Sequence, residues 1–271
     1  MARSFDPLLL SPGAKVNLAA IDAGDTSCWS GGKRKGEEAL PALREELDRL
    51  QELFYAVAQR GLLVILQGMD TSGKDGVIRH VFQGVNPQGV RVSSFKKPTP
   101  EESAHDFLWR IHRSAPSKGE IVIFNRSHYE DVLIARVHEL VPEKVWSTRF
   151  DAINAFEKEL TEEGVSVLKF FLHISREEQG RRLEERIEDP TKQWKLTLAD
   201  FHERRFWNQY MTAYQEVLRR TSTPWAPWYL LPSDRKWYRN LAVSTILVDE
   251  LRAMKLRYPP PTVRVSALKI R

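Results

Sequence analysis

Three observations on this 271-residue sequence predict an α/β fold with a five-stranded parallel sheet. Short apolar runs recur along the chain, and segments with apolar residues at helical spacing separate them. A Gly-rich turn joins the first apolar run to one of these helices. Parallel strands need crossover connections, which alternating strands and helices supply, and ligands of such sheets bind where strands end. We therefore expect the functional site near that turn.

The first strand and turn, residues 61 to 75, have the pattern of a phosphate-binding loop. The apolar run 61–67 is typical of a strand covered on both faces, and G-x-x-x-x-G-K follows it. The glycines permit positive φ and let N–H groups surround phosphate oxygens, while the lysine reaches distal phosphates and the next helix directs its positive end at the anion. The expected phosphate-binding residues are Gly68, Asp70, Thr71, Ser72, Gly73, Lys74 and Asp75.

One position departs from the usual loop. The Ser or Thr that normally follows the lysine and holds Mg²⁺ is Asp75 here, and a second acid, Asp70, lies inside the loop. Carboxylates are hard oxygen ligands that suit Mg²⁺ beside phosphates. The alternative is that Asp75 caps the following helix and Asp70 only shapes the turn.

Composition limits the class of protein. The chain is 42% hydrophobic and 28% charged, and its formal charge of +5 is compatible with a polyanionic partner or with solubility alone. Cys28 is the only cysteine, so no intrachain disulfide can form, and we find neither a signal peptide nor a long apolar run. We expect a cytoplasmic protein that has no contact with membranes.

The remaining elements follow from hydrophobic periodicity and capping signals. We expect an irregular arm over 1–35, one domain over 36–255 and a basic tail over 256–271. Within the domain, strands are expected at 61–67, 89–95, 120–124, 165–174 and 227–231. Helices are expected at 37–59, 76–83, 99–113, 142–162, 176–186, 200–220 and 235–254. Thr99-Pro-Glu-Glu102 is a capping pattern that opens the helix at 99–113.

A second motif, Asn125-Arg-Ser-His-Tyr-Glu-Asp131, follows the third strand. Phosphate-loop proteins commonly place a metal-holding carboxylate at the end of a neighbouring strand. Here position 125 is an amide, and the acids Glu130 and Asp131 come later. They either serve the metal or occupy the first turn of a helix near Tyr129, where the helix dipole favours negative charge without any function.

Basic side chains concentrate in two places. Arg176, Arg181, Arg182 and Arg186 lie on the helix that leads into a predicted lid over about 176–200, where they could neutralise charge during phosphoryl transfer. The alternative is a solvated face of i, i+4 ion pairs. Around the helix after the second strand, Lys96, Lys97, Arg110 and Arg113 form either a groove able to follow a long anion or an ordinary solvated surface.

Three motifs together resemble the polyphosphate kinase 2 family over nearly the whole chain. They are Gly-Met-Asp-Thr-Ser-Gly-Lys-Asp at 68–75, Asn-Arg-Ser-His-Tyr-Glu-Asp-Val at 125–132 and Asp-Pro-Thr-Lys-Gln-Trp-Lys at 189–195. The resemblance implies a P-loop kinase of thymidylate-kinase-like, three-layer α/β/α fold with a helical lid. It also implies transfer of the terminal phosphoryl of inorganic polyphosphate to ADP, and to AMP or other nucleotides, with Mg²⁺. Glu130 after Tyr129, with Asn125 opening the motif, resembles the class III subgroup, which phosphorylates both mono- and diphosphates.

The same resemblance suggests roles for single residues. Lys74 would hold polyphosphate, Arg126 and Arg186 would flank the transferred group, and Asp70 with Asp131 would bind Mg²⁺. Glu130 would set acceptor selectivity, while Lys97, Arg113 and Arg182 would bind phosphates. We also expect ATP among the nucleotides bound, and a homo-oligomer, either a dimer or a tetramer.

Two other functions remain open at this point. An ATP-dependent nucleotide kinase of the same fold would use the same loop and lid. A nucleic-acid-binding protein would use basic residues interleaved with Trp109, Trp194, Trp207 and Trp237, although aromatic residues at helical spacing are more often core. We expect no nucleic-acid partner.

Overall fold

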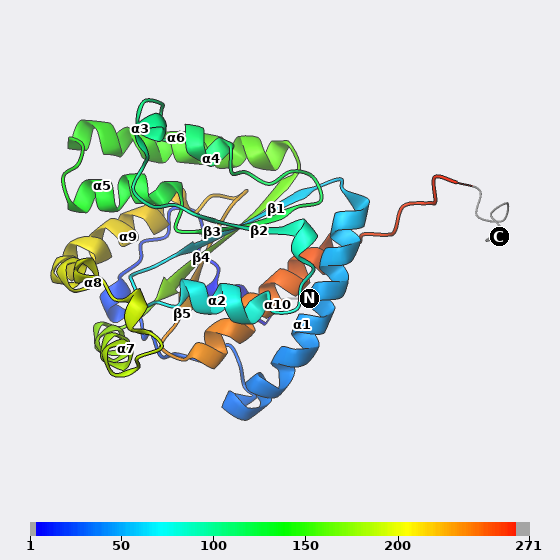
Figure 1. Ribbon diagram of the computed structural model, residues 1–271, viewed down its shortest axis with the longest axis horizontal. Coiled ribbons are helices and arrows are strands. Elements are labelled where there is room, and N and C mark those ends of the chain that lie inside the picture. Colours follow the sequence, from blue (N-terminus) through cyan, green and yellow to red (C-terminus); the bar gives the residue numbers. More distant parts are fainter. Residues whose placement is uncertain (1–3, 264–271) are drawn as a thin grey trace.

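The computed structural model describes residues 4–263 and contains a five-stranded, wholly parallel sheet of order β2-β3-β1-β4-β5 between two layers of helices (Figure 1). The strands are β1 (Gly61–Gln67), β2 (Val90–Ser94), β3 (Ile121–Asn125), β4 (Val165–His173) and β5 (Trp228–Pro232). The helices are α1 (Gly32–Val57), α2 (Lys74–Val81), α3 (Pro100–Ser103), α4 (Trp109–His112), α5 (Ile134–Val137), α6 (Glu143–Glu162), α7 (Arg176–Glu188), α8 (Leu198–Glu203), α9 (Trp207–Thr221) and α10 (Lys236–Ala253). The predicted α/β fold is confirmed.

Residue alternation along β1 divides the core into two layers. Leu62, Val64 and Leu66 pack with α1, α2 and α10, whereas Leu63 and Ile65 pack with α6 and α9 on the opposite face. Every residue of β1 is buried. A continuous apolar run is what a central parallel strand requires, because helices cover both faces of the sheet.

Residues 4–31 contain no α-helix, and the first of them pack along the edge strand β5. Leu9 forms an antiparallel bridge with Tyr229, and the N–H of Leu10 donates to the carbonyl of Trp228 at 2.8 Å. Phe5 and Leu18 are buried. The segment therefore covers an edge whose open N–H and C=O groups would otherwise pair with other chains.

Two helices expected as continuous are interrupted. In the segment 99–113 the predicted capping box is present at Thr99 and Glu102, but α3 ends at Ser103 and the Asp106 side chain accepts from the N–H of Leu108 before α4 begins. The segment 200–220 is divided by a 3₁₀ turn at Arg204–Phe206. Other boundaries differ from expectation by a few residues, because capping decides where helices end.

No helix within residues 4–263 has the length and apolar character needed to cross a membrane. Residues 264–271 of the predicted tail lie outside the described residues.

Candidate functional site

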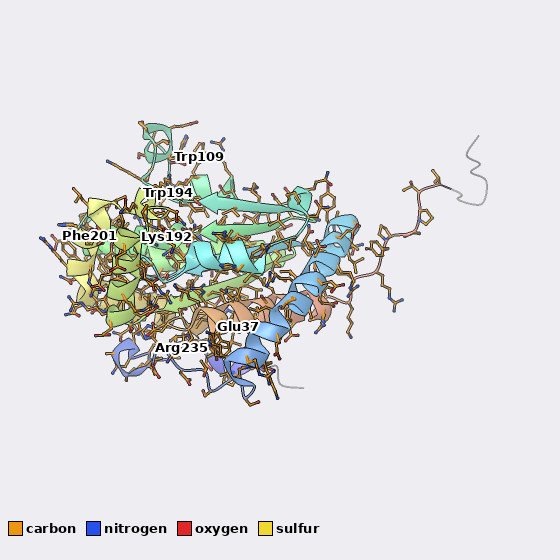
Figure 2. The ribbon with its side chains drawn as sticks, turned by 60° about the horizontal axis from the view of Figure 1, so that its bottom comes forward. Glu37, Trp109, Lys192, Trp194, Phe201 and Arg235 are labelled. Atoms are coloured by element: carbon orange, nitrogen blue, oxygen red, sulfur yellow. The ribbon has the colours of Figure 1, made fainter. Side chains whose placement is uncertain are left out.

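The phosphate loop forms the floor of a cleft of about 740 Å³. The ends of β2 and β3 supply one wall, and the lid side chains of α7 and residues 192–200 supply another; Figure 2 shows Lys192 and Trp194 on this lid. Nine of the described lysines and arginines line the cleft: Lys74, Lys96, Arg126, Arg182, Arg186, Lys192, Lys195, Lys236 and Arg239. Its carboxylates are Asp70, Asp75, Glu185 and Asp200. The surplus of cations makes this a site for polyanions.

The loop backbone adopts conformations that its glycines permit. Gly68 has φ of 147°, and a Cβ there would lie 2.6 Å from the carbonyl oxygen of Leu172. Gly73 has φ of 107° and caps α2. Thr71 also has a positive φ of 65°, which is uncommon for a residue with a Cβ and is typical of functional loops.

Lys74 lies in the first turn of α2 with its side chain folded over the loop. Its ammonium donates to the carbonyl oxygens of Gly68 at 2.6 Å and Met69 at 3.2 Å. Burial lowers the pKa of Lys74 although Asp70 opposes the shift. A buried ammonium held by carbonyl oxygens is well placed to exchange those contacts for phosphate oxygens.

Arg182 supports the loop from the lid helix α7. Its guanidinium donates to the carbonyls of Thr71 at 2.8 Å and Ser233 at 2.7 Å, and to the Glu178 carboxylate at 2.7 Å. It is 5% exposed. These contacts join the phosphate loop to the connection between β5 and α10, so the geometry favours a supporting role over the predicted direct contact with phosphate.

Two pairs connect the phosphate loop to the second motif. Arg126 donates to Asp70 at 2.7 Å, and Asn125 donates to Asp75 at 2.7 Å. Burial opposes ionisation of Asp70, but Lys74 and Arg126 outweigh it and hold the pKa of that carboxyl below its ordinary value. The second pair joins the two residues that depart from the usual motifs. Asp75 of α2 supplies the carboxylate that is normally found at the strand end, and Asn125 at the strand end donates to it.

Glu130 and Asp131 are adjacent, but their carboxylates have different neighbours. The charges that act on Glu130 are those of Arg126, Lys74 and Asp70, whereas Asp131 pairs with Arg149 at 3.0 Å and lies 3.9 Å from Arg110. Burial raises the pKa of both acids, and the nearby cations only partly oppose the shift. The expected pairing of Asp131 with Asp70 is therefore not what the structure shows. Glu130 is the acid of this motif that faces the loop.

A fully buried polar network supports the second motif from the sheet. Lys169 of β4 donates to Glu157 of α6 at 2.6 Å and to the Tyr129 hydroxyl at 2.9 Å. The same Glu157 carboxylate accepts from the Tyr129 hydroxyl at 2.7 Å and contacts His128 Nε2 at 3.3 Å. His128 and Tyr129 immediately precede Glu130, so this network holds the backbone that carries it.

Some predicted residues meet in the cleft and others do not. Lys74, Asp70, Asp75, Arg126 and Arg186 all line it. The cleft lining does not include Lys97 or Arg113, and the guanidinium of Arg113 instead lies over the Trp109 ring at 4.6 Å. Arg110 donates to the carbonyl of Lys96 at 2.8 Å. The expected groove along that helix is therefore reduced to Lys96.

The first turn of α10 brings to the cleft residues that the sequence motifs do not predict. Lys236, Arg239 and Asn240 line it together with His80 of α2. A rule on parallel sheets could have found them, because ligands bind outside the carboxyl ends of the strands and the turn after β5 is one of these ends.

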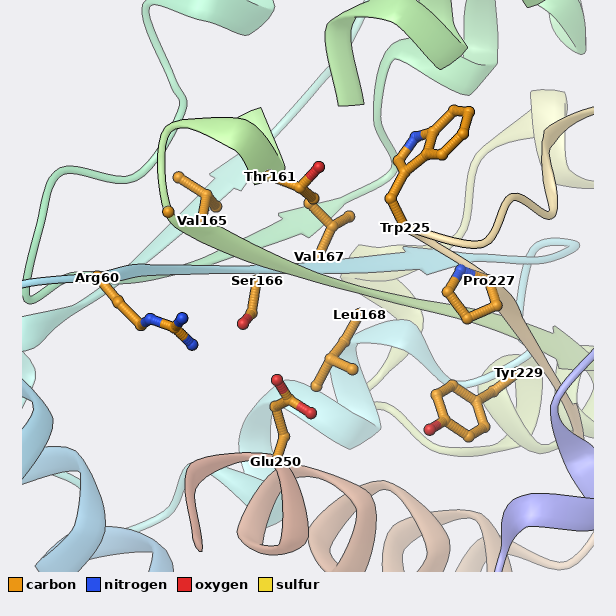
Figure 3. A pocket seen from close by; sticks show the side chains of 11 residues that line it. Arg60, Thr161, Val165, Ser166, Val167, Leu168, Trp225, Pro227, Tyr229 and Glu250 are labelled. Atoms are coloured by element: carbon orange, nitrogen blue, oxygen red, sulfur yellow. The ribbon is translucent and has the colours of Figure 1, made fainter. Parts of the chain in front are cut away.

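A second hollow, of about 270 Å³, lies where β1 and β4 begin, at the end of the sheet opposite the phosphate loop (Figure 3). Arg60, just before β1, and Glu250 of α10 both reach into it beside Ser166, Leu168 and Tyr229. One base and one acid give it no surplus of charge, so it lacks the phosphate-binding character of the cleft.

The cleft carboxylates fit a metal that phosphates help to hold. Within residues 4–263 no group of three or more His, Cys, Asp and Glu side chains is arranged to hold a metal alone. Asp70 and Asp75 supply hard oxygen ligands beside the loop, and Mg²⁺ commonly takes one or two carboxylates with substrate phosphates and water. The donor set suits Mg²⁺ in this arrangement.

Comparison with known proteins gives consistent matches. The family model described as polyphosphate kinase 2 matches residues 31–259. The AMP/ADP-polyphosphate phosphotransferase of Meiothermus ruber is 52% identical over 93% of this chain and 94% of that protein. The ADP-polyphosphate phosphotransferase of Rhodopseudomonas palustris is 44% identical over 85% of this chain and 84% of that protein. The crystal structure of polyphosphate kinase 2 from Arthrobacter aurescens TC1 superposes with a TM-score of 0.94 at 41% identity, covering 98% of this chain and 95% of that one.

Proposed function

The chain belongs to the polyphosphate kinase 2 family, and we propose from that premise that it transfers the terminal phosphoryl of inorganic polyphosphate to ADP and to AMP. It is an enzyme of the kinase type. The cationic lining of the cleft supports polyphosphate as the donor, because nine lysines and arginines surround the phosphate loop. A long polyanion uses such a surface along its whole length, whereas ATP would use part of it.

Lys74 and the loop N–H groups hold the end of the donor chain, while Arg126 and Arg186 stand on either side of the transferred group. An acceptor phosphate oxygen attacks the terminal phosphorus in line. The new P–O bond forms as the bridging P–O bond to the next phosphate breaks, and the polyphosphate leaves one unit shorter. The guanidinium groups neutralise charge on the equatorial oxygens, so no nucleophilic side chain is needed.

Asp70 and Asp75, with Glu130, would hold Mg²⁺ together with substrate phosphates. When bound, the ion neutralises the charge that develops on the donor and acceptor oxygens. Asn125 orients Asp75 through their 2.7 Å hydrogen bond, and Arg126 orients Asp70. Glu130 replaces Asp131 in this proposal, because Arg149 and Arg110 already neutralise Asp131.

Two observations support phosphorylation of both AMP and ADP. The Meiothermus ruber relative is named an AMP/ADP-polyphosphate phosphotransferase, and Glu130 lies within reach of the charges of Lys74 and Asp70. AMP is one phosphoryl unit shorter than ADP. A site that uses both must therefore place the attacking oxygen of either acceptor at the same in-line position, although the two nucleotides reach into the site to different lengths. A carboxylate beside Asp70 can hold a metal or its water where the shorter acceptor leaves space.

The test is to incubate the protein with Mg²⁺, long-chain polyphosphate and either ADP or AMP, and to follow ATP and ADP formation. Parallel reactions replace polyphosphate by ATP as donor to AMP. Product formation from polyphosphate with both acceptors supports the proposal. Transfer from ATP without any transfer from polyphosphate would assign the chain to ATP-dependent nucleotide kinases instead.

A further inference from the structure

A buried glutamine connects the two motifs of the site, and the proposed transfer step does not use it. Gln67 is the last residue of β1, directly before Gly68 of the phosphate loop, and it is 1% exposed. The described residues that line the cleft do not include it. Burial of an amide is costly unless its polar atoms find partners, so the partners of Gln67 indicate what the side chain does.

The amide nitrogen of Gln67 has two hydrogens, and the second motif offers an acceptor for each. Nε2 donates to the Ser127 hydroxyl at 3.1 Å, and the side chain also hydrogen-bonds the Glu130 carboxylate. An ionised carboxylate only accepts hydrogen bonds, so the nitrogen of the amide is the atom that faces Glu130. Gln67 Oε1 has no hydrogen-bond partner within residues 4–263. The amide therefore acts as a double donor to the second motif.

The contact with Ser127 holds a strained piece of backbone that carries Arg126. Arg126 has a φ of 62°, a left-handed conformation that is uncommon for a residue with a Cβ and persists only where neighbouring contacts hold it. Its N–H donates to the carbonyl of Leu66 at 3.3 Å, and the residue that follows it is held by Gln67. The end of β1 thus fixes the backbone on both sides of Arg126, whose guanidinium reaches Asp70 at 2.7 Å.

The second contact of Gln67 orients the Glu130 carboxylate. The buried network around Lys169 holds the backbone that carries Glu130, but it leaves the side-chain rotamer of this acid undetermined. Lys74 and Arg126 act on the carboxylate by charge, which favours proximity without setting an orientation. A hydrogen bond from a buried amide is directional, so it selects one rotamer before any substrate binds.

We propose that Gln67 is a positioning residue for phosphoryl transfer, whose amide orients Glu130 and the backbone of Arg126 relative to the phosphate loop. The inference rests on the proposed function, in which Arg126 flanks the transferred group and Glu130 serves the shorter acceptor. Because Gln67 does not line the cleft, its replacement should change the rate of transfer and the preference between acceptors, and leave polyphosphate binding as it is.

The experiment replaces Gln67 by methionine, whose unbranched side chain is similar in length but donates no hydrogen bond. The matched control is Gln51→Met, since Gln51 of α1 is a second buried glutamine and does not line the cleft. Each variant is assayed for kcat and KM with AMP and with ADP, and for the KM of long-chain polyphosphate. Calorimetry without polyphosphate gives the Kd of each nucleotide in the presence of Mg²⁺, and the thermal midpoint reports on the fold.

We expect Gln67→Met to lower kcat with AMP about tenfold or more, because a hydrogen bond to a charged group is lost. The loss with ADP should be about threefold, since the longer acceptor depends less on Glu130. The Kd of both nucleotides and the KM for polyphosphate should stay within about twofold, because alignment acts on the transfer step and not on ground-state binding. The control should change none of these constants by more than about twofold.

Two further variants separate the two contacts of Gln67. Ser127→Ala removes only the contact that holds the backbone of Arg126, so kcat should fall about threefold with both acceptors and their ratio should stay the same. In a Glu130→Asn background, addition of Gln67→Met should not change the ratio of AMP to ADP turnover further, because the carboxylate to be oriented is absent.

The inference is refuted if Gln67→Met leaves the AMP-to-ADP ratio of kcat at the wild-type value, if Gln51→Met shifts that ratio equally, or if the ratio shifts again in the Glu130→Asn background. Should Gln67→Met fail to fold, Gln67→Glu decides by the same ratio, since it keeps the size of the side chain but places a second carboxylate beside Glu130. Wild-type protein that uses ATP and not polyphosphate would refute the proposed donor, and the same variants assayed with ATP would still test Gln67. Wild-type transfer from polyphosphate with an unaffected Gln67→Met variant would refute only the inference.

Discussion

Replacement of Lys169 by methionine should destabilise the protein strongly, because it leaves Glu157 buried without its counter-ion. Lys169 lies in the middle of β4 with no exposed surface, and its ammonium contacts Glu157 at 2.6 Å, the Tyr129 hydroxyl at 2.9 Å and the carbonyl of Thr221 at 2.7 Å. Glu157 is also completely buried. Methionine fills the space of the lysine stem but offers no donor to these three oxygens.

The expected magnitude follows from the burial of the pair. Removal of one partner of a buried ion pair costs about 3–5 kcal/mol. For a chain of this size each kcal/mol shifts the thermal midpoint by roughly 2–4 °C, so the midpoint should fall by about 6–20 °C. The double variant Lys169→Met, Glu157→Met should lose much less than the sum of the single losses, because replacing a buried pair by apolar residues is often nearly neutral.

The stability deficit of Lys169→Met should depend on pH. In the wild type, burial alone would raise the pKa of Glu157, but Lys169 and His128 outweigh it and hold the pKa below its ordinary value. A depressed acid pKa stabilises the fold above the unfolded-state pKa, and that contribution is lost as pH falls. Without Lys169 the burial effect dominates and the pKa of Glu157 rises, so protonation relieves the variant. The deficit should therefore shrink from pH 8 toward acidic pH.

Thermal unfolding followed by circular dichroism at several pH values provides the measurement. Lys158→Met is the matched control: it removes a neighbouring lysine whose exposed pair with Glu162 spans 3.4 Å, and it should change stability by no more than about 0.5 kcal/mol. A loss below about 1 kcal/mol for Lys169→Met would contradict the reasoning. So would a double variant that loses the full sum, since the two side chains would then act independently.

The remaining predictions concern the cleft. Lys74→Ala should abolish transfer while the protein stays folded; turnover above about a tenth of wild type would contradict the loop assignment, since such phosphate clamps contribute about 10³-fold or more. Arg186→Lys should lower kcat much more than nucleotide affinity, because an ammonium cannot bridge two phosphate oxygens; an unchanged kcat with raised KM would assign Arg186 to ground-state binding. Glu130→Asn should lower AMP phosphorylation more than ADP phosphorylation in initial-rate assays, whereas equal losses would make Glu130 a general metal ligand. Polyphosphate binding should weaken steeply with added salt; an affinity that stayed flat between two salt concentrations would mean that the lysines and arginines are not the docking surface.

Local rules were enough to predict the strands, the phosphate loop and most helix positions. The loop G-x-x-x-x-G-K at 68–74 acts through its own backbone and one side chain, so its conformation depends on a few consecutive residues. The apolar run of β1 likewise predicts a central buried strand without knowledge of its neighbours. The interruption of the segment 99–113 was missed because the Asp106 side chain competes with the helix for backbone hydrogen bonds, an effect that apolar periodicity does not record.

The tertiary structure decided which side chains meet in the cleft. Glu130 and Asp131 are equivalent in the local pattern, and only the positions of Lys74 and Arg149 separate the acid that faces the loop from the one held in an internal ion pair. Arg239 contacts the loop from 167 residues away. Periodicity and capping are short-range effects of backbone geometry, whereas the partners of a charged side chain depend on the order in which the crossovers stack the strands. For that reason the sequence by itself determined the phosphate loop and the sheet, and the packed fold determined the charges that surround them.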